Sequence, residues 1–226
     1  MNALFPRLLL CAAVALALAA PIHAQAPKDK DKGGADFTLP WDADWVTAVT
    51  YAGDNRVVAG NNLGEIVMWE LPEKVGGGEP KPVRKFEGHT NVITRLLTSP
   101  DGRWLISSSN DHTIRFWDLQ APATKKSKFV VNARAIDESA EKKRKAPAPI
   151  EFSVESVGEN KTFSGHRDWV VAMSQSKDGL TLASGDEKGE IILWDVAAGS
   201  EKKRWKLKGW VWALALSPDA DAVAAS

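Results

Sequence analysis

A pattern that recurs at a fixed spacing is the feature that most constrains this sequence. Three segments superpose without a gap when their closing tryptophans are aligned, and the first and last residues of each are 25 positions apart: Asp44–Trp69, Val92–Trp117 and Trp169–Trp194. The runs that end them, IVMWE, IRFWD and IILWD, share the same apolar alternation. Self-similarity of this kind indicates one structural unit repeated along the chain.

The copy within Gly88–Leu119 is the most complete. It contains three runs of strand-forming residues, Val92–Leu97, Trp104–Ser107 and Thr113–Trp117. The gaps between them, Ser99–Gly102 and Ser109–His112, carry the Pro, Gly, Asn, Asp and Ser residues that favour tight turns. The unit is therefore predicted to be a set of short antiparallel strands.

The ends of this copy carry a family resemblance. Gly88-His89 at its start and Trp117-Asp118 at its end resemble the signature of the WD-repeat family. The resemblance implies an all-β fold, a β-propeller of four-stranded antiparallel blades. Such blades are apolar on both faces and must cover one another. The residues expected to face inward at the interfaces are Ile66, Met68, Ile114, Phe116, Ile191 and Leu193.

The resemblance also implies a buried network that links the opening His, a strand Ser, a turn Asp and the closing Trp of a blade. The second copy has the full set, His89, Ser107, Asp111 and Trp117. The third copy has His166, Ser184 and Trp194, but Lys188 stands at the Asp position, so its network is expected to be partial. The first copy has Pro40-Trp41 and Leu63 instead, so no network is expected there.

The N-terminus has the layout of a secretory signal peptide. Arg7 precedes an unbroken apolar run, Leu8–Ala20, and Ala24 is the expected cleavage site, so residues 1–24 are assigned to the signal. The run is short for a membrane span, which needs roughly 20 residues. An uncleaved anchor and lipid attachment at Cys11 are the alternatives. Cleavage would remove the single cysteine, and the exported chain would then form no disulfide.

The repeat region is assigned to residues 37–226, with blades that end near 69, 117 and 194 and a fourth that is truncated; one segment precedes it and another interrupts it. Residues 25–36 alternate charged residues and glycines, which is typical of a flexible charged linker. Residues 121–161 form a low-complexity insert between the third and fourth strands of one blade. We expect it to be a solvated excursion with a helix-forming middle, and a basic docking arm is the alternative.

A fourth copy begins at Trp205, and its Trp210 aligns with Trp169. Its closing tryptophan would fall beyond Ser226. A propeller needs about four blades to close, so we expect the sequence to be an N-terminal fragment of a longer protein. Closure of the ring by further copies of the chain is the alternative.

The sequence contains no pattern that favours catalysis. His89 and His166 occupy one repeat position, which indicates a structural role, and no His or Cys spacing suits a metal. No nucleophile elbow or phosphate loop is found. We expect no catalytic residue, no cofactor, no metal and no evident small-molecule substrate. Balanced charge, with 29 basic and 29 acidic residues, favours no nucleic-acid partner.

What remains for function is a surface. Aromatic residues and an arginine near the starts of the first strands form a possible interaction surface: Trp45, Arg167, Trp169, Trp210 and Trp212. Burial of these tryptophans between blades is the alternative.

We therefore predict a non-catalytic, exported protein-binding or scaffolding module, located in the periplasm or outside the cell and of bacterial origin. The membrane would be a partner only if the signal is retained. The alternative is an accessory propeller of a larger exported enzyme or cytochrome-type protein whose catalytic domain lies beyond residue 226.

Overall fold

The computed structural model describes residues 7–10, 38–43, 45–73, 78–131 and 148–226. Within these ranges all regular elements are β-strands. The strands are β1 (Arg7–Leu10), β2 (Val46–Tyr51), β3 (Arg56–Asn61), β4 (Ile66–Glu70), β5 (Lys81–Glu87), β6 (Ile93–Thr98), β7 (Trp104–Ser109), β8 (Thr113–Asp118), β9 (Lys125–Val131), β10 (Ile150–Gly158), β11 (Lys161–Ser164), β12 (Val170–Gln175), β13 (Thr181–Asp186), β14 (Glu190–Asp195), β15 (Ser200–Lys206), β16 (Leu214–Leu216) and β17 (Ala222–Ala225).

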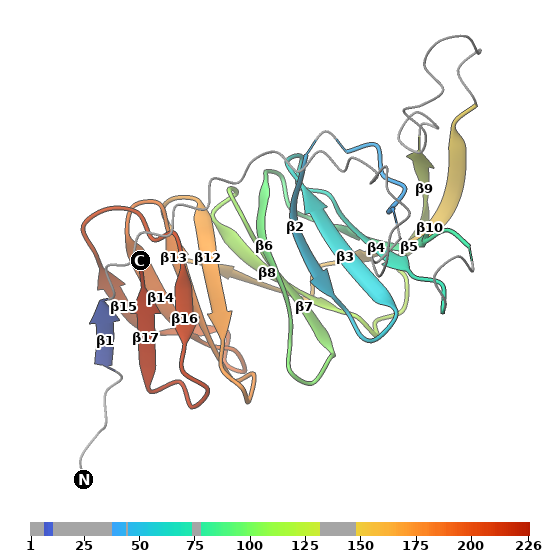
Figure 1. The fold of residues 1–226 in the computed structure, drawn as a ribbon. Coiled ribbons are helices and arrows are strands. Elements are labelled where there is room, and N and C mark those ends of the chain that lie inside the picture. The colour runs from blue at the N-terminus through green and yellow to red at the C-terminus, as the bar shows by residue number, and fades with distance from the viewer. Residues whose placement is uncertain (1–6, 11–37, 44, 74–77, 132–147) are drawn as a thin grey trace, which may run out of the picture.

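The strands form sheets that stand side by side in a row (Figure 1). Blade 1 is β2-β3-β4-β5, blade 2 is β6-β7-β8-β11 and blade 3 is β12-β13-β14-β15, and within each blade neighbouring strands are antiparallel. Blade 4 is represented by the β16-β17 pair. This is the predicted arrangement of a β-propeller, and among the described residues the row does not close into a ring.

The core lies between the blades, because each blade presents one apolar face to the next. Ile66 and Met68 of blade 1 pack against Ile93, Leu96 and Leu105 of blade 2. Further clusters join blade 2 to blade 3 through Ile114 and Phe116, and blade 3 to blade 4 through Ile191 and Leu193. All six residues that were expected to face inward are buried.

The blades approach closely at one position of the second strand. A Cβ atom on Gly60 would lie 2.6 Å from Cγ2 of Ile93, at the start of blade 2. A Cβ atom on Gly185 would lie 2.5 Å from Cγ1 of Val211, at the start of blade 4. The register makes Ser108 the equivalent residue of blade 2, since these three residues pair with Ile66, Ile114 and Ile191. Small side chains therefore set the spacing of the inner strands.

The insert differs from the prediction of a solvated excursion. It lies between β8 and β11 as expected, but it contributes β9 and β10, which form an antiparallel hairpin. β10 also pairs in parallel with β5, so the hairpin extends the sheet of blade 1 at the far end of the row (Figure 1). The alternating apolar residues of the two strands, KSKFVV and EFSVES, are the local reason for this structure. The helix expected in the middle of the insert lies outside the described residues.

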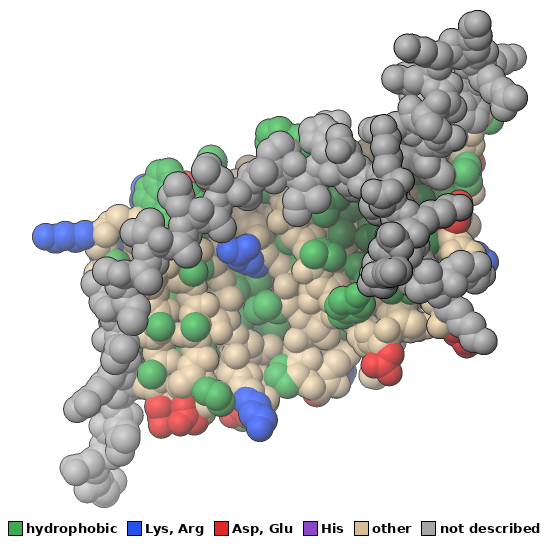
Figure 2. Space-filling view, in the orientation of Figure 1, with side chains coloured by type: hydrophobic (Ala, Val, Ile, Leu, Met, Phe, Trp, Pro, Cys, Tyr) green, Lys and Arg blue, Asp and Glu red, His purple; other side chains and the backbone are tan. Residues whose placement is uncertain are grey.

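Most of the N-terminal region lies outside the described residues as well, including the linker at 25–36. Of the expected signal segment, only β1 is described, and it runs parallel to β17. The described part of the chain contains no helix with the length and hydropathy needed to cross a membrane. Hydrophobic side chains are spread over all of the sheets on the face shown in Figure 2, and few charged side chains are in view there.

Candidate functional site

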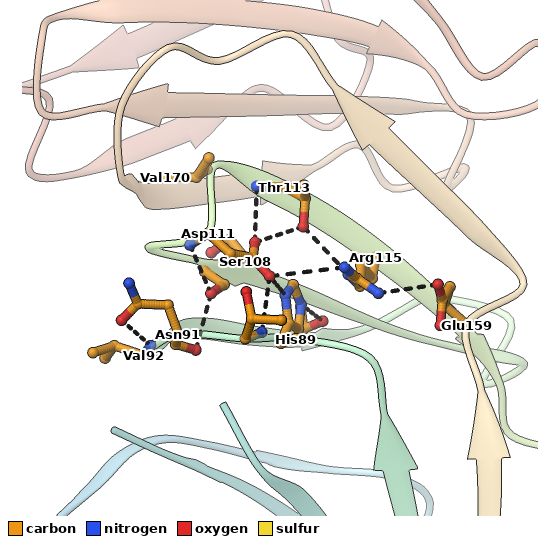
Figure 3. A network of polar contacts seen from close by, with 12 residues as sticks. His89, Asn91, Val92, Ser108, Asp111, Thr113, Arg115, Glu159 and Val170 are labelled. Carbon is orange, nitrogen blue, oxygen red and sulfur yellow. Dashed lines mark hydrogen bonds and ion pairs between the residues drawn. The ribbon is translucent and has the colours of Figure 1, made fainter. Parts of the chain in front are cut away.

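The buried network of blade 2 joins four side chains from four segments: the loop before β6, β7, the β7–β8 turn and β8. Nε1 of Trp117 on β8 donates a hydrogen bond to Oγ of Ser107 on β7, at 2.9 Å. Oγ of Ser107 lies 2.7 Å from Nε2 of His89, and Nδ1 of His89 lies 2.7 Å from Oδ2 of Asp111. Figure 3 shows His89 beside Asp111, with Thr113 and Arg115 close by. The structure thus brings together the four residues singled out for the second copy.

One arrangement of protons satisfies every group in this chain. If His89 is neutral and protonated at Nδ1, it donates to Asp111 and accepts at Nε2 from the hydroxyl of Ser107. The same hydroxyl oxygen accepts from the indole of Trp117. A fully satisfied buried network fixes one packing of the blade, because each broken contact would leave a buried polar group unpaired.

Burial and hydrogen bonding set the ionisation of the pair. Burial lowers the pKa of His89 from its ordinary value, against the opposing effect of the hydrogen bond to Asp111. Burial alone would raise the pKa of Asp111, but hydrogen bonds from His89 and Thr113 outweigh it, so that pKa lies well below its usual range. The pair is therefore a neutral imidazole and a carboxylate at neutral pH.

Blade 3 has the same network, and here the prediction of a partial set was wrong. Nε1 of Trp194 donates to Oγ of Ser184 at 2.7 Å, and Oγ of Ser184 lies 2.6 Å from Nε2 of His166. The carboxylate comes from Asp186, whose Oδ2 lies 2.9 Å from Nδ1 of His166. Lys188 is not the relevant position; its amino group instead lies 3.0 Å from the carboxylate of Asp168.

Asp186 alone accepts the backbone hydrogen bonds of its turn, whereas in blade 2 the side chains of Ser109 and Asp111 accept one each. Oδ1 of Asp186 accepts hydrogen bonds from the backbone N–H groups of Lys188 and Glu190 and closes the β13–β14 turn, while its Oδ2 faces His166. Burial acts to raise the pKa of Asp186, but the hydrogen bonds from His166 and Glu190 hold it below the ordinary value. In the sequence, this carboxylate could have been found as the Asp of Ser184-Gly185-Asp186, two positions after the network serine.

Blade 1 lacks the network, as expected from its sequence. Trp69 is buried, and its Nε1 has no hydrogen-bond partner in the part of the chain that the structure describes. The strand register places Ala59 where the other blades have Ser107 and Ser184, since each residue lies ten positions before its closing Trp. Trp41 packs against Trp69 instead, with 5.1 Å between ring centroids. Leu63 is exposed in the β3–β4 turn.

The Ser-His-Asp order of contacts resembles that of a nucleophilic triad, but the environment does not suit catalysis. Ser107 and Ser184 are fully buried, and each hydroxyl oxygen already accepts an indole hydrogen bond. A substrate would have no approach to either oxygen.

His166, Asp186 and Glu190 also place ligand-type atoms within 4.8 Å of one another. These groups already have protein partners and need no metal ion to explain their proximity. Both ring nitrogens of His166 are in hydrogen bonds, and Glu190 forms an ion pair with Arg204 at 2.8 Å.

The residues of the possible interaction surface lie exposed at one rim. Trp45, Val92 and Trp169 occupy equivalent positions. The backbone carbonyl of each accepts a hydrogen bond from a backbone N–H in the turn between the second and third strands of its own blade. Trp210 takes the same place before blade 4, because Val211 packs on Gly185 as Ile93 packs on Gly60. The exposed fractions of Trp45, Trp169 and Trp210 are 61%, 43% and 53%. Trp212, 57% exposed, has its ring centroid 4.9 Å from that of Trp210. Arg167 is exposed two residues before Trp169.

The four-stranded antiparallel blades, which cover one another face to face, have the arrangement of a β-propeller. The family model described as "WD domain, G-beta repeat" matches residues 80–118 and 158–195. These two stretches contain all eight residues of the two complete networks, so the match to WD40 repeats coincides with the networks.

Three of the similar proteins come from fungi. The chain is 36% identical over 81 residues to a "Target of rapamycin complex subunit LST8" from Saccharomyces cerevisiae, covering 35% of this chain and 27% of that protein. It is 32% identical over 120 residues to the "Target of rapamycin complex subunit wat1" of Schizosaccharomyces pombe, covering 50% of this chain and 38% of that protein. The "Small ribosomal subunit protein RACK1" of Candida albicans is 28% identical over 239 residues, with 80% of this chain and 74% of that protein covered. The chain thus spans well under half the length of the first two relatives.

Proposed function

We propose that this chain is a non-catalytic protein-binding module of an exported scaffold, and that it binds through the tryptophan rim. We define the tryptophan rim as Trp45, Trp169, Trp210 and Trp212. The observation that carries the proposal is that the repeat places three of these side chains at equivalent positions and leaves all four exposed. Exposing large aromatic side chains to water is unfavourable, and clustered exposed apolar side chains often mark a binding surface. Tryptophan is also enriched among the hot-spot residues of protein interfaces.

The site chemistry supports binding rather than catalysis. Four titratable groups of types common in catalysis, His89, Asp111, His166 and Asp186, are committed to the blade networks. The names of the relatives support the same class of function, since they describe a subunit of a complex and a protein of a ribosomal subunit. The partner we propose is therefore another protein.

The binding surface is tested with crosslinks at matched positions. Leu180 is the control, because it is 58% exposed and lies in the β12–β13 turn, at the end of β12 opposite to Trp169. A photo-crosslinking residue at Trp210 should capture a discrete partner that the same residue at Leu180 does not. The Trp45→Ala, Trp169→Ala, Trp210→Ala triple variant should lose that partner and retain its fold. Equal capture from both positions would contradict the proposal.

The proposed export rests on the signal-like sequence of residues 1–24, and it has its own test. Sequencing the N-terminus of the protein from the extracellular or periplasmic fraction should give a start at Gln25. A start at Met1, or absence of the protein from that fraction, would contradict export without touching the binding surface.

A further inference from the structure

A regular aromatic contact joins consecutive blades. Phe86 on the fourth strand of blade 1 packs against Trp117 of blade 2, with ring centroids 5.8 Å apart. Phe163 on the fourth strand of blade 2 packs against Trp194 of blade 3 at 5.2 Å. The two phenylalanines occupy one repeat position, since they pair with Ile66 and Ile114 on the adjacent strands. A fourth-strand phenylalanine of one blade therefore covers the closing tryptophan of the next.

Blade 1 receives this contact from a different element. Trp69, its closing tryptophan, packs against Phe129 on β9, with centroids 6.2 Å apart and the rings nearly perpendicular. Phe129 belongs to the hairpin inserted between β8 and β11, and not to a preceding blade. The hairpin thus supplies the aromatic ring that a fourth strand supplies elsewhere in the row.

The cluster around Trp69 shows that the hairpin covers a blade face. Ala59 and Val67 of blade 1 are buried together with Trp69, on the side of the sheet away from blade 2. The covering residues are Phe129, Val131 and Val154 of the hairpin, with Leu39, Trp41 and Phe152 partly buried beside them. Without the hairpin, this apolar face of blade 1 would be exposed and could pack against another blade.

The outward side of the hairpin is largely polar, as a terminal cap requires, although Val130 and Ile150 are also exposed. Lys126 and Lys128 on β9, and Glu151, Ser153 and Glu155 on β10, alternate with the buried residues and are exposed. Lys128 and Glu151 form an ion pair at 2.9 Å across the hairpin. The hairpin therefore replaces an apolar face by a charged one.

Two ion pairs fasten the hairpin region to the outer strand of blade 1. Arg84 on β5 lies 2.6 Å from Glu155, and Glu87 lies 2.7 Å from Lys125. Ser156 is fully buried and lies 2.6 Å from Ser127 across the hairpin. These contacts accompany the parallel pairing of β10 with β5 and fix the hairpin against one blade.

We propose that the β9–β10 hairpin is a built-in cap, which takes on blade 1 the place that a preceding blade takes on blades 2 and 3. While the hairpin is seated, no other blade can pack on Trp69. When it is released, the exposed face accepts a blade from a second copy of the chain. The cap is independent of the tryptophan rim, so the test below does not depend on the proposed function.

Phe129→Ala tests the cap in the full chain, and Val130→Ala is the matched control because Val130 lies on the same strand with its side chain exposed. Hydrogen exchange at the amides of β4 should accelerate about tenfold or more in Phe129→Ala and be unchanged in Val130→Ala. Exchange at β14 of blade 3 should be unchanged in both. Sedimentation velocity should show concentration-dependent association of Phe129→Ala alone.

The proposal fails if β4 exchange in Phe129→Ala equals that of the unmodified chain. It also fails if the accelerated variant sediments as Val130→Ala does at every concentration. Should Phe129→Ala lose protection in all blades, Val154→Ala provides the milder truncation of the same contact. Its acceleration must then appear at β4 and not at β14, and any other pattern overturns the cap.

Discussion

Asp186 contacts His166 just as Asp111 contacts His89, but Asp186 lies two positions earlier in its repeat. Asp186 lies eight positions before its closing Trp194, whereas Asp111 lies six positions before Trp117. Both carboxylates nevertheless approach Nδ1 of their histidine, at 2.9 and 2.7 Å. The contact is thus maintained by turn geometry and not by a fixed spacing.

Replacing Asp186 should therefore destabilise the protein strongly. Asp186→Ala leaves His166 without its acceptor and opens the β13–β14 turn, and breaking a buried charged contact costs about 3 kcal/mol. Lys188→Ala should change the unfolding free energy by less than about 0.5 kcal/mol, because Lys188 is an exposed partner in a surface ion pair. Urea unfolding of both variants measures the difference. Similar losses for the two would mean that Asp186 is not the network carboxylate.

The network of blade 2 predicts a similar contrast. His89→Ala or Asp111→Ala should lower the unfolding free energy by about 2–3 kcal/mol, because each leaves buried polar groups unpaired. Leu63→Ala, at the corresponding position of blade 1, should cost little, since the Leu63 side chain is largely exposed. The same urea titration compares the three variants. A loss for Leu63→Ala as large as for the other two would contradict the assignment.

Blade 1 offers a stabilising substitution. Ala59→Ser would place a hydroxyl near the buried N–H of Trp69, which has no partner among the described residues. A hydrogen bond between the two should add about 1 kcal/mol to the unfolding free energy. Ala183→Ser is the control, because Ala183 is also buried on a second strand but lies beside the network serine and not at its position. Thermal unfolding should show a higher midpoint for Ala59→Ser only. A lower midpoint for both would mean that the new hydroxyl finds no partner at either site.

Stability should fall as the pH is lowered from 7 to 3.5. The folded-state pKa values of Asp111 and Asp186 are depressed, so the unfolded chain takes up protons near its ordinary Asp pKa of about 3.9 while the folded chain does not. The pKa of His89 is depressed too, so proton uptake by the unfolded chain below about pH 6.5 also favours unfolding. Both effects have the same sign.

Urea midpoints at pH 7, 5 and 3.5 measure this dependence. His89→Ala should flatten the part between pH 7 and 5 and leave a decrease below pH 5 from Asp186. A midpoint that rises on acidification would show that the carboxylates are not stabilised in the fold.

The insert predicts opposite results for two deletions. Removing residues 125–149 deletes β9 and with it the contact between Phe129 and Trp69, so the midpoint of unfolding should drop. Replacing residues 132–147 by a short turn keeps the paired ends Val131 and Ile150 and should leave the midpoint nearly unchanged. Circular dichroism during heating distinguishes the two. Equal tolerance of both deletions would mean that the hairpin adds no stability.

The repeated parts of the fold were predictable because the repeat samples one structure several times. Ile66, Ile114 and Ile191 recur at one spacing from a tryptophan, and a residue pattern seen three times identifies a buried face without further knowledge. The apolar interfaces between blades follow from it, whereas the fourth strand of each blade was implied by the resemblance to the WD-repeat family.

Features that do not recur at the same position in each repeat could not be predicted from the repeat pattern. Asp186 escaped a gapless alignment, since a carboxylate side chain can reach the same nitrogen from two positions in a turn. The hairpin escaped because β10 pairs with β5, a strand about 70 positions earlier, and sequence alternation does not reveal distant partners. The alternation around Phe129 was a usable sign of a strand, but not of what that strand covers.

The close approach at Gly60 and Gly185 limits how neighbouring blades can vary. A Cβ atom at either glycine would meet Ile93 or Val211 of the next blade, so a larger residue there requires a smaller one opposite or a shift of the backbone. The residues at these facing positions are therefore expected to change together and not one at a time.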